Sequence, residues 1–422
     1  MSFVLPPDAR SWVEVDPDSH FPIQNLPFCT FLYSPDPATP SFSHAAVGVR
    51  IGNHVLDLTT LGVNGLLPGD QWAYGSSIAS LALIGSVEEA RSAIFELLVF
   101  DNPRLRDDIE LRRRTIYQVD AVKLLLPMPP RAFVDFYSGI NHAENVGRMF
   151  RPDQPPLLPN YRHIPIGYNG RASSVVVSGT PIRRPSGQQK VGDDVIFGPT
   201  KELDFELEMG FFTGKGNEMG EPIPIRECED HILGLVLVND WSARDIQRFE
   251  YQPLGPFLSK SFGTSISPWI VTLDALEPFR IKGMPHEPEP LPHLRNPGPA
   301  HYDINLEVSI QTQRMTKPQV ISRSNTKHLY WSFIQQLAHQ TSNGTPIQPG
   351  DLYASGTISG TEPDSFGSML ELCWKGTKPL TMDETGETRT WLEDGDTVIM
   401  SAWCQGDGYR VGFGECRGTV EG

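Results

Sequence analysis

The run Asp204-Phe205-Glu206-Leu207-Glu208-Met209 alternates acidic and apolar side chains, which is the pattern of a β-strand with one polar and one apolar face. We expect Asp204, Glu206 and Glu208 to share the polar face. The backbones of the two glutamates would lie about 7 Å apart, two strand steps, so their carboxylates could converge on one cation. The alternative is an ordinary strand whose polar face meets solvent, where alternating glutamates are common.

The same stretch of sequence extends to Thr264, and its next predicted strand also ends in an acid. The apolar run Leu233–Val238 predicts a buried strand, and Asp240 follows it closely. Residues 241–251 contain no Gly or Pro and predict a helix, on which side chains three and four positions apart share a face. Five further polar side chains of the stretch could act beside the acids: Arg244, Gln247, Tyr251, Lys260 and Thr264.

Composition restricts the class of protein. The chain has 422 residues, which at about 150 residues per domain suggests two or three domains. Its 38 Gly and 38 Pro favour turns and short strands over long helices. The net charge of −16 repels phosphate backbones, so we do not expect a nucleic-acid partner. No apolar run approaches the ~18 residues of a membrane span, and the first residues lack the apolar segment of a secretory signal.

The cysteines indicate a reducing compartment. They are odd in number, scattered and outside CxxC spacing, so we expect buried thiols instead of a disulfide framework or a zinc site, and a cytoplasmic location. The five are Cys29, Cys228, Cys373, Cys404 and Cys416.

A Pro-rich segment at residues 127–130 predicts the boundary between two domains, residues 1–126 and 127–422. In the first, residues 47–58 alternate around Gly-Asn and predict a β-hairpin. Helical periodicity predicts three helices, at residues 88–98, 107–115 and 327–339.

Candidate acid–base groups follow the boundary. Asp135, Tyr137 and His142 lie close together at the entrance to the second domain. A lone histidine is usually structural or exposed, but one near an acid in a Ser-Gly-Asn loop is a candidate for chemistry. Glu371 is flanked by apolar residues, and we interpret it either as a buried partner for a histidine or as a charge on an edge strand.

These residue types favour carbonyl chemistry. A site built only from carboxylates selects a hard cation such as Mg²⁺, Ca²⁺ or Mn²⁺ over zinc, which leaves the histidine free to act as a base. Arg, Gln and Lys donors can stabilise negative charge that develops on oxygen or carbon. Together they fit attack by activated water or formation of an enolate. The sequence has no Gly-x-Ser-x-Gly motif, so serine-hydrolase chemistry has no support.

The sequence resembles the fumarylacetoacetase family over nearly its whole length. The motifs that carry the resemblance are long and occur in the family's order. They are Asp-Ser-His-Phe-Pro-Ile-Gln-Asn-Leu-Pro (18–27), Asp-Phe-Tyr-Ser (135–138), Gly-Arg-Ala-Ser-Ser (170–174), Val-Ser-Gly-Thr-Pro-Ile-Arg-Arg-Pro (177–185), Asn-Asp-Trp-Ser-Ala-Arg-Asp-Ile-Gln (239–247), Pro-Leu-Gly-Pro-Phe-Leu (253–258), Lys-Ser-Phe-Gly-Thr (260–264) and Ser-Gly-Thr-Ile-Ser-Gly (355–360).

The resemblance implies a mainly β fold with some α, in which a small SH3-like barrel precedes a larger mixed β-roll catalytic domain, and a homodimer. It implies hydrolysis of a carbon–carbon bond of 4-fumarylacetoacetate to fumarate and acetoacetate, the last step of tyrosine and phenylalanine breakdown. It also implies a divalent cation, Mg²⁺ or Ca²⁺.

By matched position the resemblance implies a role for individual residues. The ligands of the divalent metal would be Asp135, Glu206, Glu208 and Asp240. His142 would activate water and Glu371 would orient it. The alkoxide and the departing carbanion would be stabilised by Arg244, Gln247 and Lys260. The substrate's carboxylates and oxygens would be held by Tyr137, Arg151, Tyr168, Gln247, Tyr251 and Thr357. A further cation would lie near Lys260, Gly263 and Thr264.

Two segments depart from the family pattern. Asn169 stands where a histidine is usual, and Gly139-Ile140-Asn141 replaces a more charged segment before His142. Neither removes a proposed catalytic group, although both could alter substrate affinity or loop dynamics. Two alternatives stay open: a related keto-acid enzyme, such as an acylpyruvate hydrolase, an oxaloacetate decarboxylase or an isomerase, and a non-catalytic metal-binding scaffold.

Overall fold

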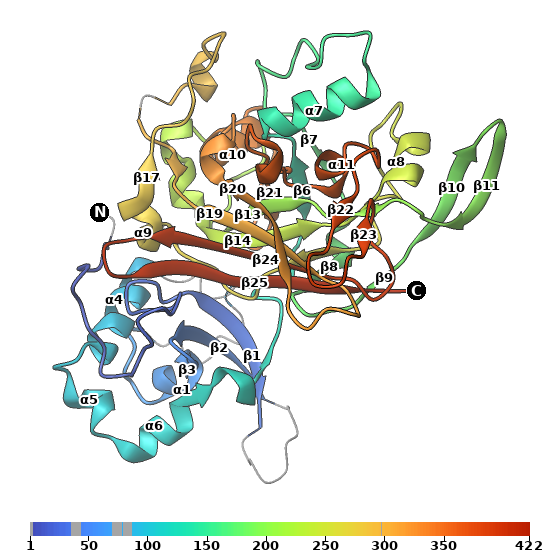
Figure 1. Ribbon diagram of the computed structural model, residues 1–422. Coiled ribbons are helices and arrows are strands. Elements are labelled where there is room, and N and C mark those ends of the chain that lie inside the picture. The colour runs from blue at the N-terminus through green and yellow to red at the C-terminus, as the bar shows by residue number, and fades with distance from the viewer. Residues whose placement is uncertain (1–2, 35–43, 70–77, 79–86, 297) are drawn as a thin grey trace.

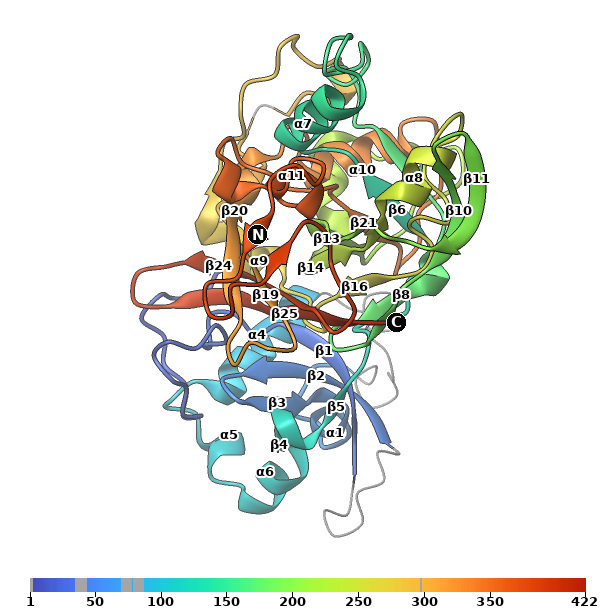
Figure 2. The ribbon, with the colours of Figure 1, turned by 45° about the vertical axis from the view of Figure 1, so that its right-hand side comes forward.

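A computed structural model describes residues 3–34, 44–69, 78, 87–296 and 298–422. The chain is mainly β, as predicted, and forms a smaller N-terminal and a larger C-terminal domain, the former lying below the latter in Figures 1 and 2. Within the described residues, no helix has both the length and the apolar character that crossing a bilayer requires.

The N-terminal domain contains a five-stranded sheet in the order β4-β3-β2-β1-β5. Its strands are β1 Phe28–Tyr33, β2 His44–Ile51, β3 His54–Asp57, β4 Ile116–Gln118 and β5 Lys123–Leu124. Strands β2 and β3 pair antiparallel across Gly52, whose φ of +53° suits glycine, so the predicted hairpin is confirmed. Among the described residues of this domain, the α-helices are α1 Leu58–Val63, α4 Val87–Leu98, α5 Pro103–Arg106 and α6 Ile109–Thr115. The helices predicted at 88–98 and 107–115 correspond to α4 and α6.

The C-terminal domain is built on a seven-stranded sheet in the order β7-β6-β21-β13-β14-β16-β8. The strands are β6 Phe133–Phe136, β7 Gly167–Asn169, β8 Val175–Val177, β13 Leu207–Thr213, β14 Ile232–Asp240, β16 Thr264–Ile266 and β21 Leu352–Ala354. β14 is buried throughout and ends on Asp240, as its apolar run predicts.

A second sheet of the C-terminal domain has the order β20-β19-β24-β25-β9. It comprises β9 Ile182–Arg183, β19 Asn305–Gln311, β20 Gln319–Asn325, β24 Thr397–Gln405 and β25 Arg410–Glu421. One buried apolar cluster joins side chains of both sheets, among them Leu237 and Val308. In Figure 1 the long strands β24 and β25 cross the molecule above the N-terminal domain.

The two domains share backbone hydrogen bonds and core. Phe28 N donates to Ile270 O (2.9 Å) and Ile270 N to Phe28 O (2.8 Å), while Asn25 Nδ2 donates to Gly412 O (2.8 Å). A single apolar cluster contains N-terminal side chains such as Val49 and C-terminal ones such as Phe212. The N-terminal domain therefore supports the sheet that carries the acids.

The acidic strand differs from its prediction. Asp204 belongs to β12 Leu203–Asp204, which pairs with β15 Ser242–Ala243, and β13 starts only at Leu207. The interruption falls at Phe205, and Glu206 forms an isolated bridge with Ser368. At this break Asp204 accepts hydrogen bonds from the backbone N–H groups of Met369 and Leu370. The solvent-facing alternative is wrong, since Asp204, Glu206 and Glu208 are all buried.

The helices of the C-terminal domain are α7 Ile140–Phe150, α8 Arg244–Glu250, α9 Leu273–Leu276, α10 Phe333–Thr341 and α11 Met369–Leu372. The predicted helix at 327–339 is wrong in its first half. Ser332 caps α10 and exchanges hydrogen bonds with Gln335, so the helix begins after it. The preceding residues Leu329 to Trp331 are buried without being helical.

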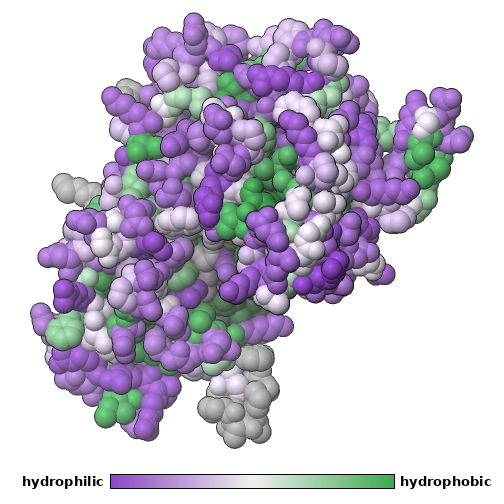
Figure 3. All heavy atoms as spheres, in the orientation of Figure 1, coloured by the Kyte–Doolittle hydropathy of each residue, from purple (hydrophilic) through white to green (hydrophobic). Residues whose placement is uncertain are grey.

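Four small strand pairs complete the described fold: β10 Ser186–Val191 with β11 Asp194–Pro199, β12 with β15, β17 Arg280–Ile281 with β18 His301–Tyr302, and β22 Leu380–Thr381 with β23 Thr388–Arg389. The β10–β11 hairpin projects from the body of the molecule as an arm in Figure 1. Figure 3 shows hydrophobic surface on this arm, where four side chains are exposed: Val191, Val195, Ile196 and Phe197.

Candidate active site

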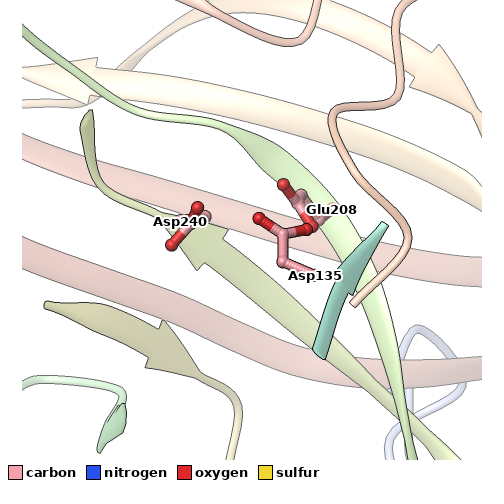
Figure 4. A group of neighbouring side chains, drawn as sticks. All are labelled: Asp135, Glu208 and Asp240. Carbon is pink, nitrogen blue, oxygen red and sulfur yellow. The ribbon is translucent and has the colours of Figure 1, made fainter. Parts of the chain in front are cut away.

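Three carboxylates from three strands converge in the C-terminal sheet. Asp135 lies on β6, Glu208 on β13 and Asp240 at the end of β14, and one oxygen of each lies within 4.8 Å of the others. Figure 4 shows the three side chains pointing toward a common space. Strands β6, β21, β13 and β14 are successive neighbours, so the sheet order itself gathers residues that are far apart in sequence.

Two oxygens of this group are buried without a hydrogen-bond partner, Asp135 Oδ1 and Glu208 Oε1. The other oxygen of Glu208 accepts from Gly356 N (2.9 Å). Buried polar atoms are nearly always satisfied in proteins, and an unsatisfied carboxylate oxygen is an acceptor that a cation can fill. The three acids therefore fit a hard divalent cation.

Glu206 lies beside this group and faces two cationic side chains. The Lys260 ammonium donates to Glu206 Oε2 and, at 2.6 Å, to Asp240 Oδ2. The guanidinium of Arg244 pairs with Glu206 Oε1 (2.7 Å) and Asp204 Oδ2 (2.7 Å). Of the four predicted metal ligands, the structure thus brings three within the compact group and places Glu206 next to it, held by Lys260 and Arg244.

Counting charges in this buried region gives an excess of negative charge. The ionisable acids are Asp135, Asp204, Glu206, Glu208 and Asp240, and the cationic side chains bound to them are Arg171, Arg244 and Lys260. Five carboxylates against three cations leave two negative charges uncompensated when all are ionised. A divalent cation would neutralise them, whereas uncompensated buried charge is costly.

The uneven distribution of cations separates the pKa values of these acids. Burial and then the charge of Asp240 raise the pKa of Asp135 to about 7. Burial also raises the pKa of Glu208, followed by repulsion from Asp135. Burial opposes ionisation of Glu206 as well, but Lys260 and Arg244 outweigh it and lower the pKa of Glu206 to about 2. Protons and a metal ion would thus compete for Asp135 and Glu208.

A histidine–carboxylate pair stands beside the acids. His142, on α7, and Glu371, on α11, are both buried, and His142 Nδ1 lies 2.6 Å from Glu371 Oε2. Burial alone would raise the pKa of Glu371, but His142 and other donors hold it below its usual value, so this carboxylate accepts and Nδ1 carries the proton. The opposite ring nitrogen, Nε2, faces Glu206 Oε1 at 4.0 Å.

Three further donors fix Glu371. Asn145 Nδ2 donates to Oε1 (3.0 Å), and the hydroxyls of Ser359 (2.9 Å) and Ser368 (2.8 Å) donate to Oε2. The interpretation of Glu371 as a buried partner for a histidine is confirmed, and its interpretation as an edge-strand charge is wrong. Ser368 caps the helix that carries Glu371, whereas Asn145 and Ser359 come from other segments, so no local pattern predicts their role.

A cavity of about 410 Å³ opens onto the acids and the histidine. Its wall includes Asp135, Glu206, Glu208, His142 and Lys260. The remaining predicted substrate-contacting and donor residues also line it: Tyr137, Arg151, Tyr168, Arg244, Gln247, Tyr251 and Thr357. The helix predicted at 241–251 is shorter, because Ser242–Ala243 pair as β15 and α8 begins at Arg244. On α8, Arg244 Nη1 donates to Gln247 Oε1 (3.0 Å), so the predicted shared face is confirmed for this pair.

Gly263 and Thr264 lie behind the cavity. Thr264 Oγ1 donates to Asp240 Oδ1 (2.7 Å) and so orients this acid, whereas Gly263 packs near Ile182. Of the two departures from the family pattern, Asn169 is exposed on β7. Gly139 packs against the carbonyl of Thr357 so closely that a Cβ would lie 2.2 Å from its oxygen, which makes glycine necessary at the start of α7.

Arg171 was missed as a functional residue, although it stands in one of the motifs of resemblance. Its guanidinium pairs with Asp135 (2.8 Å) and Asp240 (2.5 Å). No local sequence pattern predicts that Arg171 binds these acids, because Asp135 and Asp240 are distant in sequence and Arg171 itself lies in a loop.

Comparisons with known proteins agree with this arrangement. The family model described as fumarylacetoacetate (FAA) hydrolase C-terminal matches residues 131–421, and the one described as fumarylacetoacetase N-terminal matches residues 24–127. The chain belongs to the fumarylacetoacetase family. The fumarylacetoacetase of Rattus norvegicus is 50% identical over 418 residues, covering 97% of this chain and 98% of the relative. That of Homo sapiens is 49% identical over 420 residues, with the same shares of each chain.

Solved structures share the fold of this fumarylacetoacetase-family chain. A fumarylacetoacetate hydrolase from psychrophilic Exiguobacterium antarcticum superposes with a TM-score of 0.53 at 17% identity, covering 94% of this chain and 99% of that one.

We predict that a divalent ion stabilises the protein more at high than at low pH. The pKa of Asp135 is raised in the metal-free fold, so that fold binds its proton more tightly than the unfolded chain and loses stability as pH rises toward 7. A metal ion replaces this proton and removes the loss. The pKa of Glu206 is lowered, so its ionised form stabilises the fold fully at pH values above its usual pKa of 4.5. Its contribution to stability is therefore constant over this pH range.

The measurement is the melting temperature with and without Mg²⁺ at about pH 5 and about pH 8. The increase should be larger at the higher pH, and Asp135→Asn should remove most of the difference. An equal increase at both pH values in the wild type would contradict the prediction.

Proposed function

We propose that this chain hydrolyses the carbon–carbon bond of 4-fumarylacetoacetate to give fumarate and acetoacetate, the last step of tyrosine and phenylalanine breakdown. The observation that carries the proposal is the His142–Glu371 pair beside the group of buried acids, at the wall of one cavity. Relatives that are 49–50% identical over nearly the whole chain are named fumarylacetoacetase. The chain is accordingly proposed to be a hydrolase that acts on carbon–carbon bonds of ketonic substrates.

Asp135, Glu208 and Asp240, with Glu206 adjacent, would hold a divalent cation, which we propose to be Mg²⁺ or Ca²⁺. Such an ion would polarise the oxygens of a β-dicarbonyl group and orient the substrate. These carboxylates fit a divalent cation because two of their oxygens are unpaired and because the buried region carries two excess negative charges when all its acids are ionised. A second cation near Lys260, Gly263 and Thr264 is a further proposal from the family resemblance.

His142 is proposed to be the general base. With Nδ1 protonated and bound to Glu371, its Nε2 is the free acceptor, and it can take a proton from a water molecule in the cavity. Glu371 holds the ring in this orientation and stabilises the imidazolium that forms. Because Glu371 is itself fixed by Asn145, Ser359 and Ser368, the ring needs no reorientation during the reaction.

Departure of a carbon leaving group requires that its negative charge be delocalised into an adjacent carbonyl. Arg244, Gln247 and Lys260 are proposed to stabilise this charge and that of the alkoxide. Arg151 Nε and Thr357 Oγ1 are buried without a partner, which suits groups that wait for a ligand. We propose that they bind substrate oxygens together with Tyr137, Tyr168, Gln247 and Tyr251, the other predicted contacts that line the cavity.

The protein is further proposed to be a homodimer located in the cytoplasm. Five buried free cysteines are compatible with a reducing compartment. The exposed apolar side chains of the β10–β11 arm offer a surface that a second copy could cover, since an isolated two-stranded hairpin is only marginally stable. The division into residues 1–126 and 127–422 also stays a proposal, supported by the two family models, which meet between residues 127 and 131.

We predict that His142→Ala lowers turnover of fumarylacetoacetate by roughly 10²–10⁴-fold, the usual contribution of a general base, and leaves metal binding intact. Turnover is measured as loss of the substrate's ultraviolet absorbance in the presence of Mg²⁺ or Ca²⁺, and metal binding by calorimetry. His163→Ala, which removes an exposed histidine, is the control and should be fully active.

Three outcomes would contradict this assignment. An active His142→Ala would exclude the proposed base. A wild type that binds metal but consumes no keto acid would favour the non-catalytic scaffold. Faster consumption of oxaloacetate or an acylpyruvate would favour the related keto-acid enzymes.

We predict that Phe197→Asp converts the dimer to a monomer, because it places a charge on the arm where Phe197 is 75% exposed. The mass in solution is measured by light scattering after gel filtration. Phe100→Asp, at an exposed aromatic of the N-terminal domain, is the control and should remain dimeric. A dimeric Phe197→Asp would exclude the arm as the contact, and a monomeric wild type would exclude the homodimer.

A further inference from the structure

Arg171 occupies the centre of the acidic site without lining the cavity. Its Nη2 donates to Asp135 Oδ2 (2.8 Å), to Asp240 Oδ2 (3.1 Å) and to the Tyr168 hydroxyl (2.7 Å), and its Nη1 donates to Asp240 Oδ1 (2.5 Å) and Thr264 Oγ1 (3.2 Å). One planar guanidinium therefore ties together two of the three converging acids.

The position of this side chain is enforced by the backbone and by aromatic packing. Arg171 has φ of +60°, a left-handed conformation that residues other than glycine rarely adopt. Gly170 N donates to Phe133 O (3.0 Å), which fastens the loop to β6, the strand that carries Asp135. The central carbon of the guanidinium lies 4.8 Å from the centre of the Phe133 ring and 5.0 Å from that of the Tyr168 ring. A planar guanidinium whose position is fixed in this way also fixes the rotation of the carboxylates that it binds.

The hydrogen bonds leave one open oxygen on each of two acids. Asp135 Oδ2 is taken by Arg171 and Tyr168, and Oδ1 is unpaired. Glu208 Oε2 is taken by Gly356 N, and Oε1 is unpaired. Both oxygens of Asp240 already accept from Arg171. Asp135 and Glu208 thus each offer an ion a single open oxygen, and Asp240 could bind it only through an oxygen shared with a protein donor.

We propose that Arg171 is a positioning residue that enforces this single-oxygen arrangement and thereby weights the site toward Mg²⁺ relative to Ca²⁺. Mg²⁺ is small, takes six ligands in octahedral geometry and binds carboxylates through one oxygen, whereas Ca²⁺ takes six to eight oxygens and commonly uses both oxygens of a carboxylate. Holding Asp135 and Asp240 in fixed rotation removes the second oxygen that Ca²⁺ would use. The inference rests on the metal site of the proposed function.

The test is calorimetric titration of the metal-stripped protein with MgCl₂ and, separately, with CaCl₂. The variants are Arg171→Lys, which keeps the charge but loses the planar fork, and Arg171→Met, which loses both. In both, the ratio of the Kd for Ca²⁺ to the Kd for Mg²⁺ should fall about tenfold or more, the scale on which partners of metal ligands act. Arg389→Met is the matched control, because Arg389 is also buried and pairs with Asp396 (2.8 and 3.0 Å). Its ratio should equal that of the wild type.

Equal shifts of both Kd values in the Arg171 variants would overturn the proposal, because a residue that only adds charge or stability changes both ions alike. If Arg171→Met does not fold, Arg171→Lys and Tyr168→Phe carry the test. Tyr168→Phe removes the other donor to Asp135 Oδ2 and should shift the ratio in the same direction. A wild type that binds neither ion would overturn the metal site of the proposed function and this inference with it. A wild type that binds metal with a ratio unaltered by the variants would overturn only this inference.

Discussion

The burial of more carboxylates than cations is the constraint on which this structure depends. Asp135, Glu206, Glu208 and Asp240 are all buried, and Lys260, Arg171 and Arg244 neutralise them only in part. Isolated charges of this kind are costly in a protein interior, so they persist only where an ion, a proton or a ligand completes the balance. The raised pKa of Asp135 and the unpaired oxygen of Glu208 both reflect this shortage of positive charge.

The fold supplies the rigidity that this arrangement requires. Strands β6, β13 and β14 carry one acid each, and their opposite faces are anchored in apolar clusters, with Phe211 stacked on Tyr353 at 4.9 Å. The N-terminal domain packs against this sheet and shares its core, which explains why a domain without clustered catalytic groups accompanies the site. Above the sheet, α7 and α11 bring His142 to Glu371. The candidate acids and the histidine thus lie mostly on strands and short helices, whereas Lys260 and Arg171, which bind the acids, lie on loops.

Local sequence patterns predicted the parts of the site that are local. The alternation around Glu208 and the apolar run before Asp240 are period-two and buried-strand signals, and both gave real strands. The break at Phe205 could not be predicted, because the residues that bond to its neighbours Asp204 and Glu206 are the distant Ser368, Met369 and Leu370. For the same reason the pairing of Arg171 with two acids was not foreseen. Residues 329–332 fall within the predicted helical periodicity but pack as buried, non-helical chain, so tertiary contacts override the pattern there.

A bound ion that balances the buried carboxylates is tested most directly by locating it in a crystal. Crystals grown with Mn²⁺, whose anomalous scattering identifies it, should show one peak at about 2.0–2.2 Å from oxygens of Asp135, Glu208 and Asp240. That result would establish that a divalent ion completes the charge balance. A well-ordered site with no anomalous peak among these three carboxylates would contradict it, and the buried negative charge would then need protons as its only compensation.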